Sequence, residues 1–218
     1  MDGSVVTIGR NDGGSTSGDS ASDGDSGKAI ELFALVAYLP EALSEFLSRI
    51  RRDLDPHFLG KPHLTLLPPR LLSSTWEQAW AELQPAIAAS SPVDVGLGDV
   101  ETFLASQVVY VALSKGYLAV ETLHGLLNAG CASCRELWPY HPHVTLAHGF
   151  FSENLADAAK NAQHRWSEYS GERGFTIDRL TWVKTTIVPG VNERGTRSLV
   201  ASDSMWVDLA ESKLATRI

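Results

Sequence analysis

The sequence predicts an α+β domain built from two similar halves. Segments with helical and strand patterns alternate from residue 30 onward, and the order of these segments in the first half recurs in the second. The five residues Pro-His-Leu-Thr-Leu at 62–66 also return as Pro-His-Val-Thr-Leu at 142–146, at equivalent places of the two halves. Self-similarity of this kind indicates an internal duplication.

The N-terminal residues differ in composition from the rest of the chain. Residues 9–27 are rich in Gly, Ser and Asp and contain no large apolar side chain. Such a stretch cannot bury enough surface to offset the entropy that is lost on ordering. We therefore expect residues 1–28 to form a disordered tail and residues 29–218 to form a single domain.

The first half opens with an apolar, β-prone strand at 30–40. The next segment, 41–54, predicts a helix, because its apolar residues recur at helical spacing and Pro40 suits a helix start. Ser74 or Thr75 is a suitable cap for the second helix of this half. This second helix spans 74–90, and the other elements of this half are a short strand at 62–68 and strands at 92–103 and 106–114.

The second half repeats this order without the opening strand. Its first helix has leucines along one side, and its last strands alternate apolar and polar residues. The expected elements are a helix at 116–130, a strand at 142–150, a helix at 152–170, and strands at 175–186 and 197–209.

Composition bounds the class of protein. Hydrophobic residues make up 44% of the chain, enough for a sizeable core, and the net charge of −8 argues against a broad basic surface for nucleic acid. No apolar run reaches the roughly 18 residues of a membrane span. The N-terminus lacks a secretion signal, and two cysteines make no disulfide framework. We expect a cytoplasmic protein without membrane contact, and a monomer, because the duplication supplies both halves of a site.

The repeated motif places a His and a Thr on one face of each strand. Side chains alternate along a strand, so His63 and Thr65 point to one side while their leucine neighbours point to the other. His143 and Thr145 are arranged in the same way. If the halves pack around a pseudo-two-fold axis, the two His–Thr pairs face each other across one groove.

Two facing histidines and two hydroxyls fit proton transfer at a phosphodiester. A neutral histidine takes a proton from the attacking water or hydroxyl, and a protonated one gives a proton to the leaving oxygen. The hydroxyls of Thr65 and Thr145 donate hydrogen bonds to non-bridging phosphate oxygens. Because the histidines carry the protons, this chemistry needs no metal or other cofactor.

The paired motifs resemble those of the 2H phosphoesterase superfamily, and within it the 2′-5′ RNA ligase-like and RNA 2′,3′-cyclic phosphodiesterase branch. That family is defined by two H-x-(T/S)-x motifs, matched here by residues 63–66 and 143–146, and its members open with a strand similar to 32–40. The resemblance covers roughly residues 29–209. It implies a bilobal α+β fold, in which two pseudo-symmetric antiparallel sheets line a central cleft and helices pack outside.

The resemblance also implies roles for the motif residues. His63 and His143 are the acid–base pair, and Thr65 and Thr145 bind the phosphate. Members of the family act on 2′,3′-cyclic phosphates, on related cyclic phosphodiesters, or on 2′-5′ linkages, which implies hydrolysis of a cyclic phosphate at an RNA end or on a small nucleotide, or action on a 2′-5′ linkage. We therefore expect a nucleotide or RNA-end substrate. Which histidine is the acid, which is the base and which product isomer forms stay open.

Three further residues are candidate substrate contacts. Trp182 and Lys184 share a face of a strand expected to line the second lobe, where they could stack a base and hold a phosphate. His141 has the parity of His143 and is expected either to border the cleft or to lie in a solvated turn. Three arginines are either extra phosphate contacts or part of a solvated face: Arg51, Arg52 and Arg70.

Two alternatives compete with a metal-independent enzyme. A non-catalytic nucleotide- or RNA-binding module would keep the same cleft, although binding alone needs no matched pair of histidines. Cys131 and Cys134, with His141 and His143 downstream, form a four-ligand zinc set on paper. Against zinc, His143 already belongs to the histidine pair, and the cysteines fall near the end of a helix. The role of these cysteines stays open.

Overall fold

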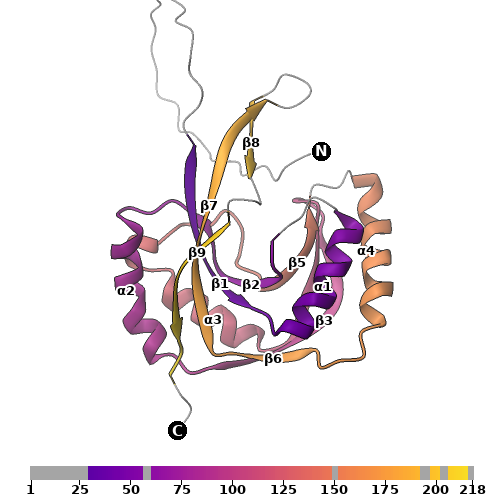
Figure 1. Ribbon diagram of the computed structural model, residues 1–218, viewed down its shortest axis with the longest axis horizontal. Coiled ribbons are helices and arrows are strands. Elements are labelled where there is room, and N and C mark those ends of the chain that lie inside the picture. The colour runs from indigo at the N-terminus through magenta and orange to yellow at the C-terminus, as the bar shows by residue number, and fades with distance from the viewer. Residues whose placement is uncertain (1–28, 56–59, 149–151, 192–196, 202–205, 216–218) are drawn as a thin grey trace, which may run out of the picture.

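The computed structural model describes residues 29–55, 60–148, 152–191, 197–201 and 206–215 (Figure 1). Within these ranges the chain forms two antiparallel β-sheets with four α-helices packed around them. This arrangement confirms the bilobal α+β fold expected from the sequence. The predicted tail, residues 1–28, lies outside the described residues.

The first sheet carries the first motif. Its strands are ordered β2-β1-β7-β8, and β9 pairs with the earlier part of β7. Figure 1 shows β7 running from the region of β6 up to β8, alongside β1. The strands span His63–Arg70 (β2), Ile30–Tyr38 (β1), Arg179–Val191 (β7), Arg197–Ala201 (β8) and Val207–Lys213 (β9).

The second sheet carries the second motif and has the strand order β5-β4-β3-β6. The single strand expected at 175–186 is in fact two strands: β6 pairs with β3, and after Asp178 the chain enters the first sheet as β7. Most of the strand that was expected to line the second lobe therefore belongs to the first sheet. The second sheet consists of His143–His148 (β5), Val108–Lys115 (β4), Val93–Phe103 (β3) and Gly174–Ile177 (β6).

The helices begin close to the positions expected from the sequence. Pro40 directly precedes α1, and Thr75 caps α2 by accepting a hydrogen bond from the backbone N–H of Gln78. Figure 1 shows α2 on one side of the molecule and α1 with α4 on the other. No described helix is both long and apolar enough to cross a membrane. The helical elements are α1 (Glu41–Leu54), α2 (Trp76–Ala89), α3 (Tyr117–Leu127), α4 (Ser152–Ser167) and the short 3-10 turn η1 (Gly130–Ala132).

One apolar core joins the two lobes, and both motif strands contribute to it. Leu64, Leu66, Val144 and Leu146 are fully buried in this core. The His and Thr side chains that alternate with them stay partly exposed on the other face. The alternation predicted for the two motifs is therefore present in the structure.

Both motif strands lie at the edge of their sheets. Among the described strands, β2 pairs only with β1, and β5 pairs only with β4. The two strands also contact each other, so the lobes meet along these edges. An edge strand leaves backbone carbonyls without a ladder partner, so donors from elsewhere in the chain must satisfy them.

Candidate active site

The ladder register fixes the direction of each motif histidine. His63 lies opposite Tyr38 of β1, and His143 lies opposite Ala112 of β4. Residues that are directly opposite in an antiparallel pair point to the same face. Tyr38 therefore shares the face of the first histidine.

A matched backbone contact fixes the tautomer of each histidine. The Nδ1–H of His63 donates to the carbonyl of Lys61 at 2.7 Å, and the Nδ1–H of His143 donates to the carbonyl of His141 at 2.6 Å. A carbonyl oxygen only accepts, so Nδ1 carries the proton in both neutral rings. Nε2 is then the unprotonated nitrogen that can take a proton from a substrate or water. The proline before each histidine favours an extended conformation in the residue whose carbonyl accepts.

Both motif histidines are neutral at pH 7. Burial lowers the pKa of His63 from 6.5 to about 4, and the positive charge of Arg51 lowers it further, while the backbone hydrogen bond opposes the shift. Burial likewise lowers the pKa of His143 to about 4. A charge on His143 also lowers the pKa of His63, so the two rings are close enough to interact electrostatically. The strands that carry the two histidines, β2 and β5, also contact each other.

Two aromatic side chains flank His63. Trp206, which directly precedes β9, stacks on its ring with centroids 5.2 Å apart, and Tyr38 meets it edge-on at 6.3 Å. The Tyr38 oxygen is hydrogen-bonded to the Trp206 side chain and donates to Oδ1 of Asp208 at 2.5 Å. Burial and the Asp208 carboxylate raise the pKa of Tyr38, so its hydroxyl keeps its proton. These contacts hold the indole of Trp206 over the imidazole.

His143 has a matching pair of aromatic neighbours. The Phe103 ring lies edge-on to it at 5.1 Å, the Tyr110 ring lies at 5.0 Å, and the two aromatic rings stack on each other at 4.1 Å. The hydroxyl of Tyr110 donates to Oε2 of Glu101 at 3.0 Å, and burial raises the pKa of this phenol. Each motif histidine therefore lies beside a tyrosine whose hydroxyl is bound to a carboxylate.

His141 extends the aromatic group around the second histidine. Its ring is partly exposed and contacts those of Phe103, Tyr110 and Tyr117 at centroid distances of 5.2, 5.6 and 5.4 Å. Its centroid lies 6.3 Å from that of His143. His141 therefore packs among aromatic rings beside His143 rather than lying in a solvated turn.

The hydroxyls of the motif threonines are available to a ligand. Thr65 and Thr145 are partly exposed, and in the part of the chain that the structure describes neither hydroxyl is hydrogen-bonded. Their backbone carbonyls, in contrast, are engaged: Tyr140 donates to that of Thr65, and Arg51 donates to that of Thr145. The carbonyls are therefore bound, whereas the two hydroxyls have no hydrogen-bond partner among the residues that the structure describes.

Trp182 does not line this site. Its side chain is fully buried on the opposite face of the first sheet, where it contacts the rings of Phe33 and Trp80. Lys184 shares that face and donates to Oε1 of Glu31 at 2.7 Å. The predicted substrate contact by Trp182 is therefore wrong, because its strand crosses into the first sheet with this face against the core. Lys184 lies away from the histidines for the same reason.

Arg51 and Arg70 are buried rather than solvated, and their guanidinium groups bind protein atoms. Arg51 is 1% exposed and donates to the carbonyls of Gly60 and Thr145. Neither Arg51 nor Arg70 is exposed to solvent, so neither is placed as the surface phosphate contact that the sequence suggested. Arg70 is 3% exposed and donates to the carbonyls of Pro68 and Ala132 and to the side chains of Asn128 and Glu136.

The two cysteines lie apart from the histidine contacts. The thiol of Cys131 and its backbone N–H both donate to the carboxylate of Glu82, and Cys134 is tied through its backbone to Asn128. His141, the histidine that the zinc alternative requires, packs among aromatic rings instead. Among the described residues, no group of three or more His, Cys, Asp or Glu side chains is placed to hold a metal ion.

Sequence patterns missed the aromatic residues around the histidines. Tyr38 could have been found, because an antiparallel hairpin between the first strand and the first motif places the end of one strand beside the start of the other. Trp206 and Asp208 could not, because their positions depend on the pairing of β9 with β7, which no local pattern determines. His124 could not be found either, because its burial and its hydrogen bond to the carbonyl of Leu66 depend on how α3 packs on β2.

The fold and the site define an α+β protein with two sheets, each of which has a His-x-Thr motif on its edge strand. A family model described as the 2′-5′ RNA ligase superfamily matches residues 39–186, more than half of the chain. The chain therefore belongs to this superfamily, which is part of the 2H phosphoesterases. The resemblance seen in the sequence motifs is confirmed.

Solved structures show the same fold. E. coli LigT in its apo form is 18% identical, with a TM-score of 0.55, and the match covers 87% of this chain and 99% of LigT. LigT complexed with ATP is 20% identical, with a TM-score of 0.53 and coverage of 85% and 98%. LigT complexed with phosphate is 18% identical, with a TM-score of 0.51 and the same coverage. The comparison with curated protein sequences gives no match.

Proposed function

We propose that this protein hydrolyses phosphodiesters without a metal ion, with His63 and His143 as the acid–base pair. The observation that carries the proposal is the matched state of the two rings, each of which donates Nδ1–H to the carbonyl two residues earlier and leaves Nε2 unprotonated. Two such nitrogens near each other can serve both the attacking and the leaving oxygen of one phosphate. Membership of the 2H phosphoesterases supports this chemistry.

The proposed substrate is a 2′,3′-cyclic phosphate on a small nucleotide or an RNA end, or a 2′-5′ linkage. In hydrolysis of the cyclic phosphate, one histidine takes a proton from water as the water oxygen bonds to phosphorus. The other histidine gives a proton to the ribose oxygen as its bond to phosphorus breaks. The product is a phosphomonoester with a free ribose hydroxyl, and proton exchange with solvent restores both rings.

Side chains around the histidines fit the rest of a nucleotide. The hydroxyls of Thr65 and Thr145 would donate to the non-bridging phosphate oxygens as negative charge builds up there. The rings of Trp206, Phe103 and His141 offer apolar faces and edges to a nucleobase. LigT, which shares the fold, has been crystallised with ATP and with phosphate. Both motifs belong to one chain, so a monomer would hold a complete site.

The test is hydrolysis of the four 2′,3′-cyclic nucleoside monophosphates in excess EDTA, with the product isomer identified by chromatography. Turnover that persists in EDTA is the expected result, and the isomer shows which ribose oxygen leaves. Loss of activity in EDTA with recovery on adding zinc would contradict the proposal. A folded protein that binds nucleotides but cleaves neither these substrates, 2′-5′ linked dinucleotides nor cyclic RNA ends would be the binding module instead.

A further inference from the structure

The free edges of the two motif strands are closed by side chains from the opposite half of the chain. The hydroxyl of Tyr140, which lies just before the second motif, donates to the carbonyl of Thr65 in the first motif at 2.7 Å. Arg51, from α1 of the first half, donates from Nε and Nη2 to the carbonyl of Thr145 in the second motif at 2.9 and 2.5 Å. In both contacts the acceptor is the backbone carbonyl of a motif threonine. Each donor comes from the other half, so both contacts join the two halves.

Arg51 also reaches the segment that leads into the first motif. Its Nη1 donates to the carbonyl of Gly60 at 2.8 Å, three residues before His63. One buried guanidinium therefore binds both motif regions at once, and its planar fork makes the directions of these bonds rigid. A buried charge is tolerated because carbonyl oxygens surround it.

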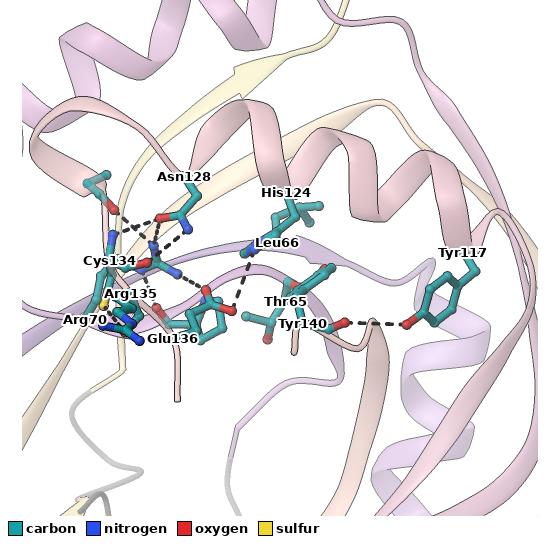
Figure 2. Close-up of polar contacts among 12 residues, drawn as sticks. Thr65, Leu66, Arg70, Tyr117, His124, Asn128, Cys134, Arg135, Glu136 and Tyr140 are labelled. Atoms are coloured by element: carbon teal, nitrogen blue, oxygen red, sulfur yellow. Dashed lines mark hydrogen bonds and ion pairs between the residues drawn. The ribbon is translucent and has the colours of Figure 1, made fainter. Parts of the chain in front are cut away.

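Tyr140 is held by a second set of contacts, shown in Figure 2. The ring of His124 stacks on the Tyr140 ring at 3.8 Å with an interplanar angle of 3°, and its Nδ1–H donates to the carbonyl of Leu66 at 2.7 Å. Two consecutive carbonyls of β2 thus receive donors from the second half. Burial raises the pKa of Tyr140, so its hydroxyl keeps the proton that it donates.

We propose that Arg51 and Tyr140 are positioning residues that hold His63 and His143 at their working separation by binding the backbone carbonyls of the two motif threonines. This inference rests on the proposed phosphodiesterase function, in which both histidines must reach one phosphate. The carbonyls lie two residues from the histidines on rigid strands, so loss of either contact lets one strand move relative to the other. A displacement of about 1 Å in such a site costs about 100-fold in rate.

The first test compares Tyr140→Phe with Tyr169→Phe in the full chain. Tyr169 packs on Phe46 and Trp166, and among the described residues no ring contact joins it to either motif. Tyr140→Phe removes one oxygen and keeps the stack on His124. We expect kcat to fall about 10-fold or more with KM within about 2-fold of wild type, while Tyr169→Phe keeps the wild-type kcat. Equal kcat values for the two variants would overturn the role of Tyr140.

The second test compares Arg51→Lys with Arg173→Lys. Arg173 also donates to backbone carbonyls, those of Trp166 and Tyr169, but away from the motifs. Lysine keeps the positive charge and loses the fork, so both variants lose stability while only Arg51→Lys is expected to lose about 100-fold in kcat. A kcat for Arg51→Lys that matches that of Arg173→Lys would show a merely structural role.

A spectroscopic measurement separates this inference from the proposed function. Ring ¹H–¹⁵N shifts of the two histidines report their surroundings whether or not the protein turns over a substrate. We expect Tyr140→Phe and Arg51→Lys to change the shifts of both His63 and His143, and the two control variants to leave them unchanged. Unchanged shifts in the test variants would overturn the positioning role, whereas changed shifts in a protein without activity would remove only the proposed function.

Discussion

The indole of Trp206 lies almost parallel to the imidazole of His63, with ring centroids 5.2 Å apart and planes inclined by 21°. A small apolar cluster of Ala34, Val36 and Val183 lies beneath this aromatic pair, with Tyr38 packed against it. The first histidine therefore lies in a mostly apolar environment built by β1, β7 and Trp206. This environment explains why its pKa lies below the usual value.

Removal of the Trp206 ring should raise the pKa of His63. Burial is the main cause of the lowered pKa, and Trp206→Ala admits water to one face of the imidazole. We expect the pKa of His63 to move from about 4 towards 6.5, and the pKa of His143 to stay near its original value. Histidine NMR titration measures both, and Trp206→Phe, which keeps a ring, is the control. A His63 pKa that is the same in Trp206→Ala as in wild type would contradict this view of the site.

An anion should raise the pKa of at least one motif histidine. Both are neutral at pH 7 in the free protein, yet one must carry a proton to serve as the acid. A phosphate between the rings supplies the negative charge that favours the protonated form. With sulfate as a probe of fixed charge, we expect NMR titration to show a rise of about 1 pKa unit or more. Unchanged pKa values at saturating sulfate would mean that the anion does not bind between these histidines.

The free energy of unfolding should depend on pH through the same two residues. A histidine with a lowered pKa in the folded state stabilises the fold fully above pH 6.5, and this contribution is lost as pH falls towards 4 because the unfolded chain binds the proton more readily. Between pH 6.5 and pH 5 the loss is at most about 2 kcal/mol per histidine. Urea unfolding of wild type and of a His63→Gln, His143→Gln double variant measures it. The variant should lose less stability over this range, and an equal loss in both proteins would contradict the assignment.

Arg70 should contribute far more to stability than an exposed arginine does. Its buried guanidinium donates to two backbone carbonyls and also to the side chains of Asn128 and Glu136. Arg70→Met therefore leaves these buried acceptors, one of them a carboxylate, without their donor. We expect a loss of about 3 kcal/mol or more in the free energy of unfolding. The control, Arg179→Met, breaks the exposed ion pair with Glu211 and should cost less than about 1 kcal/mol. Similar losses for the two variants would show that the network around Arg70 adds nothing.

Local pattern was sufficient for much of the fold and for the strand faces on which the motif histidines lie. Apolar spacing and caps located the helices, and strand alternation put His63 and His143 on the faces that the structure shows. Local pattern could not predict which strands pair over long distances in the sequence. Trp182 has the correct alternation, but only the crossing of β7 into the first sheet reveals that its face belongs to the core. Arg51 reads as a surface cation of an amphipathic helix until the second lobe covers it and supplies the carbonyl of Thr145.

The most direct test of the histidine pair measures hydrolysis of 2′,3′-cyclic nucleoside monophosphates in EDTA by His63→Ala, His143→Ala and His164→Ala. His164 lies on α4 in an exposed i,i+4 pair with Glu168 and serves as the matched control. We expect each motif variant to lose at least about 100-fold in kcat, as removal of a general acid or base does, while His164→Ala keeps the wild-type rate. Wild-type turnover by either motif variant would contradict the two-histidine mechanism.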